Sequence, residues 1–370
     1  MISMTRRAAI LACVLYHMAL GHSHAEGSNS IRIGSWSGGP SIQAQSRQFE
    51  GCVARSANSQ GIIMSYAIDP QYRWRLVVSN PAWSFTPGYS LALVLRLDDR
   101  NYLRGRAIVS GAQTLEIRTD DELSLFSGLW SANRLQVTAG GTKFEFELFD
   151  SNEVLSALLQ CVVRQSGWSA RKNAPPMPIR LDSETRAETR AIANEILAYS
   201  RIGQVQMSTA SAMSSAQHGG TSWKSGLINS ALDVLEPKGI ARLADVPLRL
   251  LDQEIRKCRN RFYFAWRLEQ VDRLEIARVF TVCPAPELTT FAYYLAVSRS
   301  KGGYYLLSST TSGGGFGGVV QQQLEEMDAK LRRSFNMAVN TFEQAQARNR
   351  PPESDVTADK PEFPAPLGRD

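Results

Sequence analysis

Histidine is nearly absent from this chain outside its first 25 residues. Of the four histidines, His17, His22 and His24 lie in that N-terminal stretch, which leaves His218 alone in the rest of the chain. Machinery that needs a histidine base would depend on this one residue, and a zinc site built from several histidines is excluded. His218 lies among Ser, Gly and Gln residues, a composition typical of an exposed loop.

Catalytic signature motifs are lacking as well. The sequence contains no G-x-S-x-G elbow, no H-E-x-x-H pair and no P-loop. Residues 313–318 contain G-x-G-x-x-G, but a dinucleotide-binding unit continues into a parallel strand, whereas here only a helix and the C-terminal tail follow. Carboxylates at residues 98–99 and 120–122 fall in predicted turns, where side chains are usually solvated. We therefore predict no catalytic residue, no metal ligand and no cofactor.

The first 25 residues contain the three parts of a secretory signal peptide. Arg6 and Arg7 precede an apolar run over residues 8–20, and Ser23 and Ala25 supply the small side chains of a cleavage site. The run is too short to span a bilayer, and no second long apolar run follows it. We expect cleavage after Ala25 and a periplasmic or secreted product that has no transmembrane segment after processing.

Cysteine is scarce, but its number is informative. Lipidation at Cys13 is the alternative to signal cleavage, and beyond it four cysteines remain: Cys52, Cys161, Cys258 and Cys283. An even number in an exported protein predicts two disulfides, for which three connectivities exist. Local pairing, Cys52 with Cys161 and Cys258 with Cys283, is favoured because each pair encloses one sheet-like region. No cysteine cluster has the spacing of a zinc site.

Charge of one sign does not dominate the chain. The 41 Lys and Arg residues exceed the 35 Asp and Glu residues by six, and the two signs are interspersed without a basic run. This pattern predicts a solvated surface of mixed charge and no nucleic-acid partner.

Apolar and polar residues alternate repeatedly between residues 49 and 148. Trp74, Leu76 and Val78 fall on one side of a predicted strand, and polar residues fall on the other. Such alternation predicts an antiparallel sheet with one buried face. Over residues 151–164 the apolar period becomes helical. The first domain is therefore predicted to be an antiparallel β-meander closed by a helix and a disulfide.

The second half of the chain mixes helical and strand patterns. Aromatic hairpins are predicted over residues 261–283 and 290–309, and a long amphipathic helix begins near residue 319. We expect an α+β protein whose second domain has helices flanking a small antiparallel sheet. The expected organisation is a signal peptide (1–25), an N-terminal extension (26–48), a disulfide-closed β-rich domain with a C-terminal helix (49–164), a Pro-rich linker (165–184), a second α+β domain (185–344) and a disordered tail (345–370).

Aromatic side chains give the remaining functional signal. Several alternate along the predicted strands of the second domain, where exposed members would bind sugar rings, an aromatic ligand or a partner's edge. Core packing explains the same alternation. The possible ligand contacts are Phe262, Phe264, Trp266, Tyr293, Tyr304 and His218.

The first domain also carries a set of short matching segments. They are Phe49-Glu50-Gly51-Cys52-Val53-Ala54, Trp74-x-Leu76, Asn80-x-x-Trp83, Phe144-Glu145-Phe146 and Cys161-Val162. In these segments the chain resembles uncharacterised periplasmic proteins of alphaproteobacteria. The resemblance implies a periplasmic location, and it brings no activity and no functional residues with it.

Two classes of function remain. The first is an exported, non-catalytic envelope protein that binds a partner protein, a cell-wall polymer or a small ligand. The alternative is a periplasmic hydrolase whose carboxylates converge only in the folded chain. The missing histidines and motifs favour the binding protein. A deep pocket with two or more converging Asp or Glu residues of raised pKa would favour the hydrolase.

Export can be tested at the predicted cleavage site. Because a small residue is required immediately before the cut, Ala25→Arg should leave unprocessed precursor, detected as a larger band by immunoblotting. Normal maturation of this variant, or a lipid attached to Cys13, would contradict the prediction.

Overall fold

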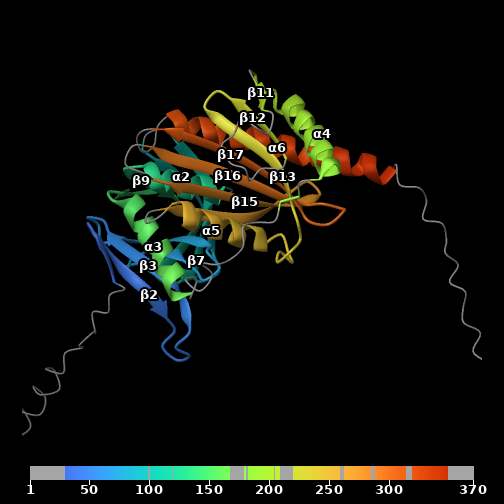
Figure 1. The fold of residues 1–370 in the computed structure, drawn as a ribbon. Helices are drawn as coiled ribbons and strands as arrows, with labels where there is room; N and C mark the ends of the chain where they lie inside the picture. The colour runs from blue at the N-terminus through green and yellow to red at the C-terminus, as the bar shows by residue number, and fades with distance from the viewer. Residues whose placement is uncertain are drawn as a thin grey trace, which may run out of the picture.

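The chain forms two antiparallel sheets and five helices, α2 to α6, within the residues that the structure describes (Figure 1). This computed structural model describes residues 30–98, 101–119, 121–166, 179–180, 182–203, 205–208, 220–258, 262–284, 288–313 and 319–348. The predicted α+β class is confirmed. Ala25, His218 and most of the predicted linker and tail lie outside the described residues.

The first sheet has ten strands. They are β1 (Ile31–Ile33), β2 (Trp36–Ile42), β3 (Phe49–Ala57), β4 (Ile63–Ile68), β5 (Trp74–Ser79), β6 (Ser90–Leu97), β7 (Asn101–Gly111), β8 (Thr114–Thr119), β9 (Arg134–Ala139) and β10 (Thr142–Glu147). Their order in the sheet is β1-β2-β3-β4-β5-β8-β7-β6-β9-β10. The sheet begins earlier than we expected, because β1 and β2 lie in the stretch 26–48 and β2 pairs with β3.

The alternation of the sequence becomes the two faces of this sheet. Trp74, Leu76 and Val78 point inward and are buried, whereas Arg75 between them is exposed. The sheet curls around helix α3 (Ser151–Gln165), which contacts β1 to β4. Its far edge closes the curl, because Asn58 Nδ2 after β3 donates a hydrogen bond to the carbonyl oxygen of Glu145 in β10 at 3.1 Å.

Helix α2 (Glu122–Ser131) was not predicted from the sequence. Nearly every side of it is buried, so its residues show no polar stripe; the buried ones include Leu123, Phe126 and Trp130. Of the carboxylates that we expected in solvated turns, Asp121 instead has a structural role. Asp121 caps the helix by accepting a hydrogen bond from the Ser124 backbone N–H at 3.1 Å.

The second sheet has seven strands, with helices on both faces (Figure 1). Helices α4 (Ser183–Ser200) and α6 (Val319–Arg348) pack together on it, and α5 (Asp245–Lys257) contacts β15. Helix α6 extends four residues into the predicted tail. The strands are β11 (Val205–Ser208), β12 (Thr221–Ser225), β13 (Ile228–Leu235), β14 (Tyr263–Val271), β15 (Leu274–Cys283), β16 (Thr289–Ser298) and β17 (Tyr304–Gly313), in the order β11-β12-β13-β17-β16-β15-β14. None of the helices in the described parts of the chain is long and apolar enough to cross a bilayer.

The two sheets share one buried core at edge strand β14. Helices α2 and α3 each contact strands of the first sheet and also β14. The indole N–H of Trp74 donates to the Phe264 carbonyl oxygen at 2.7 Å, and that of Trp266 donates to the Gln71 carbonyl oxygen at 3.0 Å. The indole of each tryptophan thus bonds to a backbone carbonyl of the other half of the chain, beside a buried cluster that contains residues of both sheets.

Two disulfides join the pairs expected from the sequence. Cys52 in β3 is bonded to Cys161 in α3 with 6.2 Å between their Cα atoms, and Cys258 at the end of α5 to Cys283 in β15 with 5.2 Å. Disulfides of this kind are typical of an oxidising compartment.

Removal of the first disulfide should destabilise the whole described core. The Cys52→Ser/Cys161→Ser double variant opens a loop with a sequence separation of 109 residues, and we expect a loss of about 2–5 kcal/mol in the free energy of unfolding. Because the core is shared, urea unfolding should remain a single transition by both fluorescence and circular dichroism. An unchanged midpoint, or two separated transitions, would contradict this expectation.

Candidate functional site

A cavity of about 270 Å³ opens where the first sheet meets β14. Its apolar wall is formed by Trp74 of β5, Leu123 and Phe126 of α2, and Trp266 and Leu268 of β14. The indole N–H groups of both tryptophans are bonded to backbone carbonyls. Their rings are therefore fixed in orientation, with no unsatisfied donor. Trp266 is half-buried and offers apolar surface to a ligand, whereas Trp74 is 7% exposed and offers less.

Three charged side chains add polar groups to this wall: Glu122, Arg73 and Arg267. Both guanidinium groups have carboxylate partners, since Arg73 Nε lies 2.8 Å from Asp69 Oδ2 and Arg267 Nε lies 2.5 Å from Glu269 Oε1. Glu122 forms no hydrogen bond or ion pair with any residue in the described parts of the chain. Its carboxyl group is therefore available to a ligand.

Burial raises the pKa of Glu122 above its ordinary value of 4.5, against the opposing effect of Arg267 and Arg118. A half-buried carboxyl group with a raised pKa can accept hydrogen bonds when ionised and donate one when protonated. The cavity thus combines aromatic surface with one adaptable polar group.

A buried charge cluster lies behind the cavity. The Arg278 guanidinium contacts Asp121 Oδ1 at 2.8 Å, Glu269 Oε1 at 3.2 Å and Asp328 Oδ2 at 2.6 Å. Burial opposes ionisation of Asp121, but Arg278 and the Ser124 N–H together lower its pKa to about 2. Glu269 belongs both to this cluster and to the Arg267 pair, so the cluster holds a wall residue of the cavity in place.

The pair of carboxylates that a hydrolase requires is not assembled at this cavity. Among the described residues, Glu122 is the one carboxyl group that lines it. Asp121 is directed toward Arg278. Asp328 lies on α6, and burial raises its pKa. It pairs with Arg278 and does not line the cavity.

Of the possible ligand contacts named from the sequence, Trp266 lines the cavity. Phe262, Phe264, Tyr293 and Tyr304 are buried in the core, where the Tyr293 ring packs 4.7 Å from that of Phe280. His218 lies outside the described residues. Sequence reasoning missed the partners of Trp266, because Trp74 and Glu122 belong to the other half of the chain.

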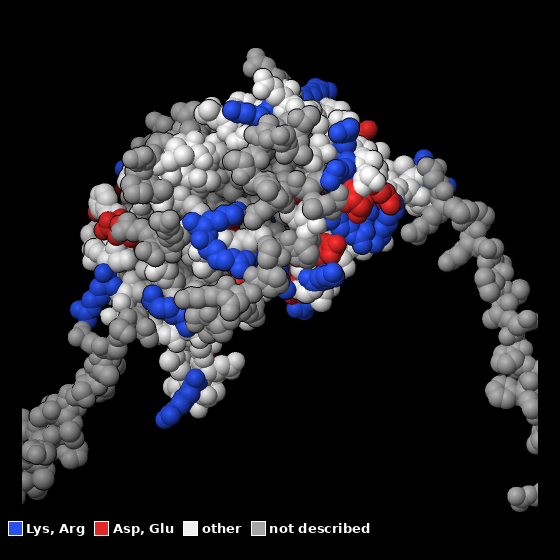
Figure 2. Space-filling model, viewed as in Figure 1, with Lys and Arg blue, Asp and Glu red and all other residues white. Residues whose placement is uncertain are grey.

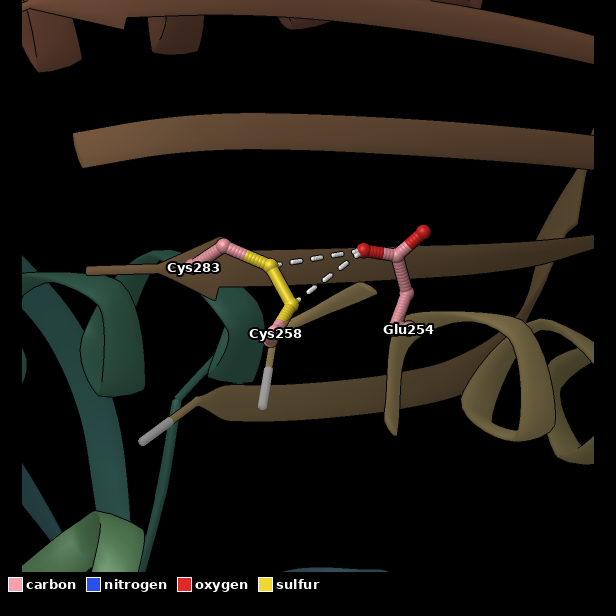
Figure 3. A group of neighbouring side chains, drawn as sticks. All are labelled: Glu254, Cys258 and Cys283. Atoms are coloured by element: carbon pink, nitrogen blue, oxygen red, sulfur yellow. Dashed lines mark hydrogen bonds between the residues drawn. A yellow bond between two sulfur atoms is a disulfide. The ribbon is translucent and has the colours of Figure 1, made fainter. Parts of the chain in front are cut away.

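A second group of side chains gathers where α5 meets the end of β15 (Figure 3). Glu254 Oε2 lies 3.7 Å from the sulfur atoms of both Cys258 and Cys283. The three residues have the proximity of metal ligands, but the sulfurs are bonded to each other, and thiolate is the form that binds metal. Tyr294 donates its hydroxyl to Glu254 Oε1 at 2.9 Å, so this carboxylate is held within the fold.

Comparison with known proteins assigns no role to this cavity. No protein-family model matches the chain, and no curated protein matches it. Among solved structures it is similar to the crystal structure of invasion-associated protein B from Bartonella henselae, with 15% sequence identity and a TM-score of 0.27. That similarity covers 37% of this chain and 99% of the other. With so low a TM-score, the function of this chain has to be argued from its own residues.

Proposed function

We propose that this chain is an exported, non-catalytic binding protein, and that its cavity between the two sheets binds one ring of a saccharide from a cell-wall polymer. The observation that carries the proposal is the pair of indoles, Trp74 and Trp266, fixed by their own hydrogen bonds beside the unpartnered carboxyl group of Glu122.

The wall chemistry fits a sugar ring. Saccharide rings have an apolar face that packs on aromatic side chains and an edge of hydroxyl groups that bond to carboxylates and guanidinium groups. Trp266 and Trp74 supply the aromatic surface, and Glu122, Arg73 and Arg267 supply the polar partners. The volume of about 270 Å³ is near the lower end of small-molecule sites, about 300 Å³, which favours a single ring.

Binding without cleavage agrees with the carboxyl groups that line the cavity. Glycoside hydrolysis requires two carboxyl groups about 5–5.5 Å apart in retaining enzymes or about 6.5–9.5 Å apart in inverting ones. Within the described residues Glu122 has no such partner on the cavity wall. A saccharide held here would be positioned but not hydrolysed.

Loss of one indole should weaken binding. We expect Trp266→Ala to reduce the affinity for soluble peptidoglycan fragments by about tenfold or more, equivalent to about 1.4 kcal/mol, as measured by calorimetry. Trp266→Phe should retain part of the affinity, and Tyr89→Ala, at a site that is 68% exposed, is the matched aromatic control. Equal affinity in Trp266→Ala, or no saccharide binding by the wild-type chain, would overturn the proposal.

Glu122 should give the cavity a pH signature. Because its pKa is raised in the folded state, the folded chain holds the proton more tightly than the unfolded chain, and stability is lost as pH rises through the interval above 4.5. Glu122→Gln removes this loss, so the variant should melt above the wild type at about pH 7, with a smaller difference near pH 4. The control is Glu147→Gln, at an exposed position. A Glu122→Gln advantage that is the same at both pH values would refute the assignment.

A further inference from the structure

The outer face of the first sheet carries an exposed array of basic side chains. We call it the basic face and define it by Arg55, Arg75, Arg104, Arg106, Arg118 and Lys143, all exposed. They come from five strands, β3, β5, β7, β8 and β10, and the strand pairing places them on one side of the sheet. In the sequence these residues are scattered, and the strand order brings them together.

The register concentrates charge at the centre of this face. Arg106 and Arg118 are direct partners on β7 and β8, and Arg75 on β5 lies beside Arg118 because the next residue, Leu76, pairs with Ile117. Arg104 follows on the same side of β7. Arginines from three neighbouring strands therefore lie about 5 Å apart between strands.

Little negative charge offsets this array. On the same face Glu116 pairs with Arg118 at 2.9 Å, Glu145 pairs with Arg134 at 3.3 Å, and Glu147 is also exposed. Arg75, Arg104 and Arg106 form no ion pair with any residue that the structure describes. Like charges directly opposite each other destabilise a sheet, so a bound anion would relieve an existing repulsion.

The shape and the other side chains of the face favour a membrane surface over a polymer. The face lies on the outside of a sheet that curls around α3. Tyr102, 63% exposed, and Val94, 39% exposed, stand among the arginines, and the Arg96 guanidinium lies 5.3 Å from the centre of the Tyr102 ring. Tyrosine, with an apolar ring and a polar tip, suits the boundary between lipid and water.

At one edge of the face the surface is hollowed. A polar cavity of about 300 Å³ lies over β2 and β3, where Arg55 and its strand partner Ser37 are among the lining residues. A guanidinium group and a hydroxyl group are both donors to phosphate oxygens. We propose that the basic face docks this protein on an anionic membrane surface by binding phosphate-bearing lipid headgroups.

Vesicle co-sedimentation tests this docking. The probe is the exported chain, recovered after processing, with vesicles of phosphatidylcholine alone or with about one third phosphatidylglycerol. We expect binding to the anionic vesicles that weakens as salt is raised, since charge attraction is screened within a Debye length. Equal binding to both vesicles, or binding to soluble polyphosphate in preference to vesicles, would overturn the proposal.

Charge reversal locates the surface. Arg104→Glu/Arg106→Glu should lower the vesicle partition coefficient by about tenfold or more, because each basic residue near an anionic surface contributes to attraction. The matched control with the same charge change is Arg186→Glu/Arg190→Glu on α4, where basic and acidic side chains are mixed (Figure 2). Equal loss in the control would show a net-charge effect and contradict the proposal.

A second basic area lies over α5 in Figure 2. Because it is also basic, it is a stricter control for the basic face than the mixed surface of α4. Arg242, three residues before α5, and Arg256 within it are both exposed. Arg242→Glu/Arg256→Glu should leave vesicle binding intact, and loss of binding in this variant alone would place the docking surface near α5 and not on the sheet. Circular dichroism checks that each variant is folded. Trp266→Ala should bind vesicles as the wild type does, which separates this proposal from the saccharide site.

Discussion

The buried guanidinium group of Arg278 is the interaction on which the arrangement of the two sheets depends. Its side chain is 2% exposed, and it contacts Asp121 at the start of α2, Glu269 on β14 and Asp328 on α6. Burying charges is costly unless they are paired, and breaking such a pair typically costs about 3–5 kcal/mol. The three carboxylates can contact this one guanidinium group together only when α2, β14 and α6 have their observed positions.

The cavity follows from that constraint. Once Asp121 fixes the start of α2, the next residue, Glu122, is placed on the cavity wall, and Glu269 holds Arg267 on the other side. The hydrogen bonds from the indole N–H groups of Trp74 and Trp266 then set the separation of β5 and β14. The cavity and the joint between the sheets are therefore built from the same side chains, so the stability of the joint limits the geometry of the cavity.

Features set by local sequence could be predicted, and features set by distant contacts could not. The alternation around Trp74 predicts a strand, and the helical period before Cys161 predicts α3, because each pattern reports one buried face. Helix α2 escaped prediction since it is buried on nearly all sides. The cavity escaped it because Trp74 and Phe264, which join its two walls, are 190 residues apart. The basic face escaped it because the order β5-β8-β7 is not readable from alternation.

The contacts that join the first sheet to β14, including the hydrogen bonds of Trp74 and Trp266, have a consequence for how the chain folds. During synthesis the residues of the first sheet, α2 and α3 are made before those of β14. Until then Trp74 and Trp130, whose rings pack against Tyr263 of β14 in the folded chain, lack this contact. Transiently exposed apolar surface of this kind promotes aggregation. Arrival of β14 is thus the step that ends the vulnerable period of the nascent protein.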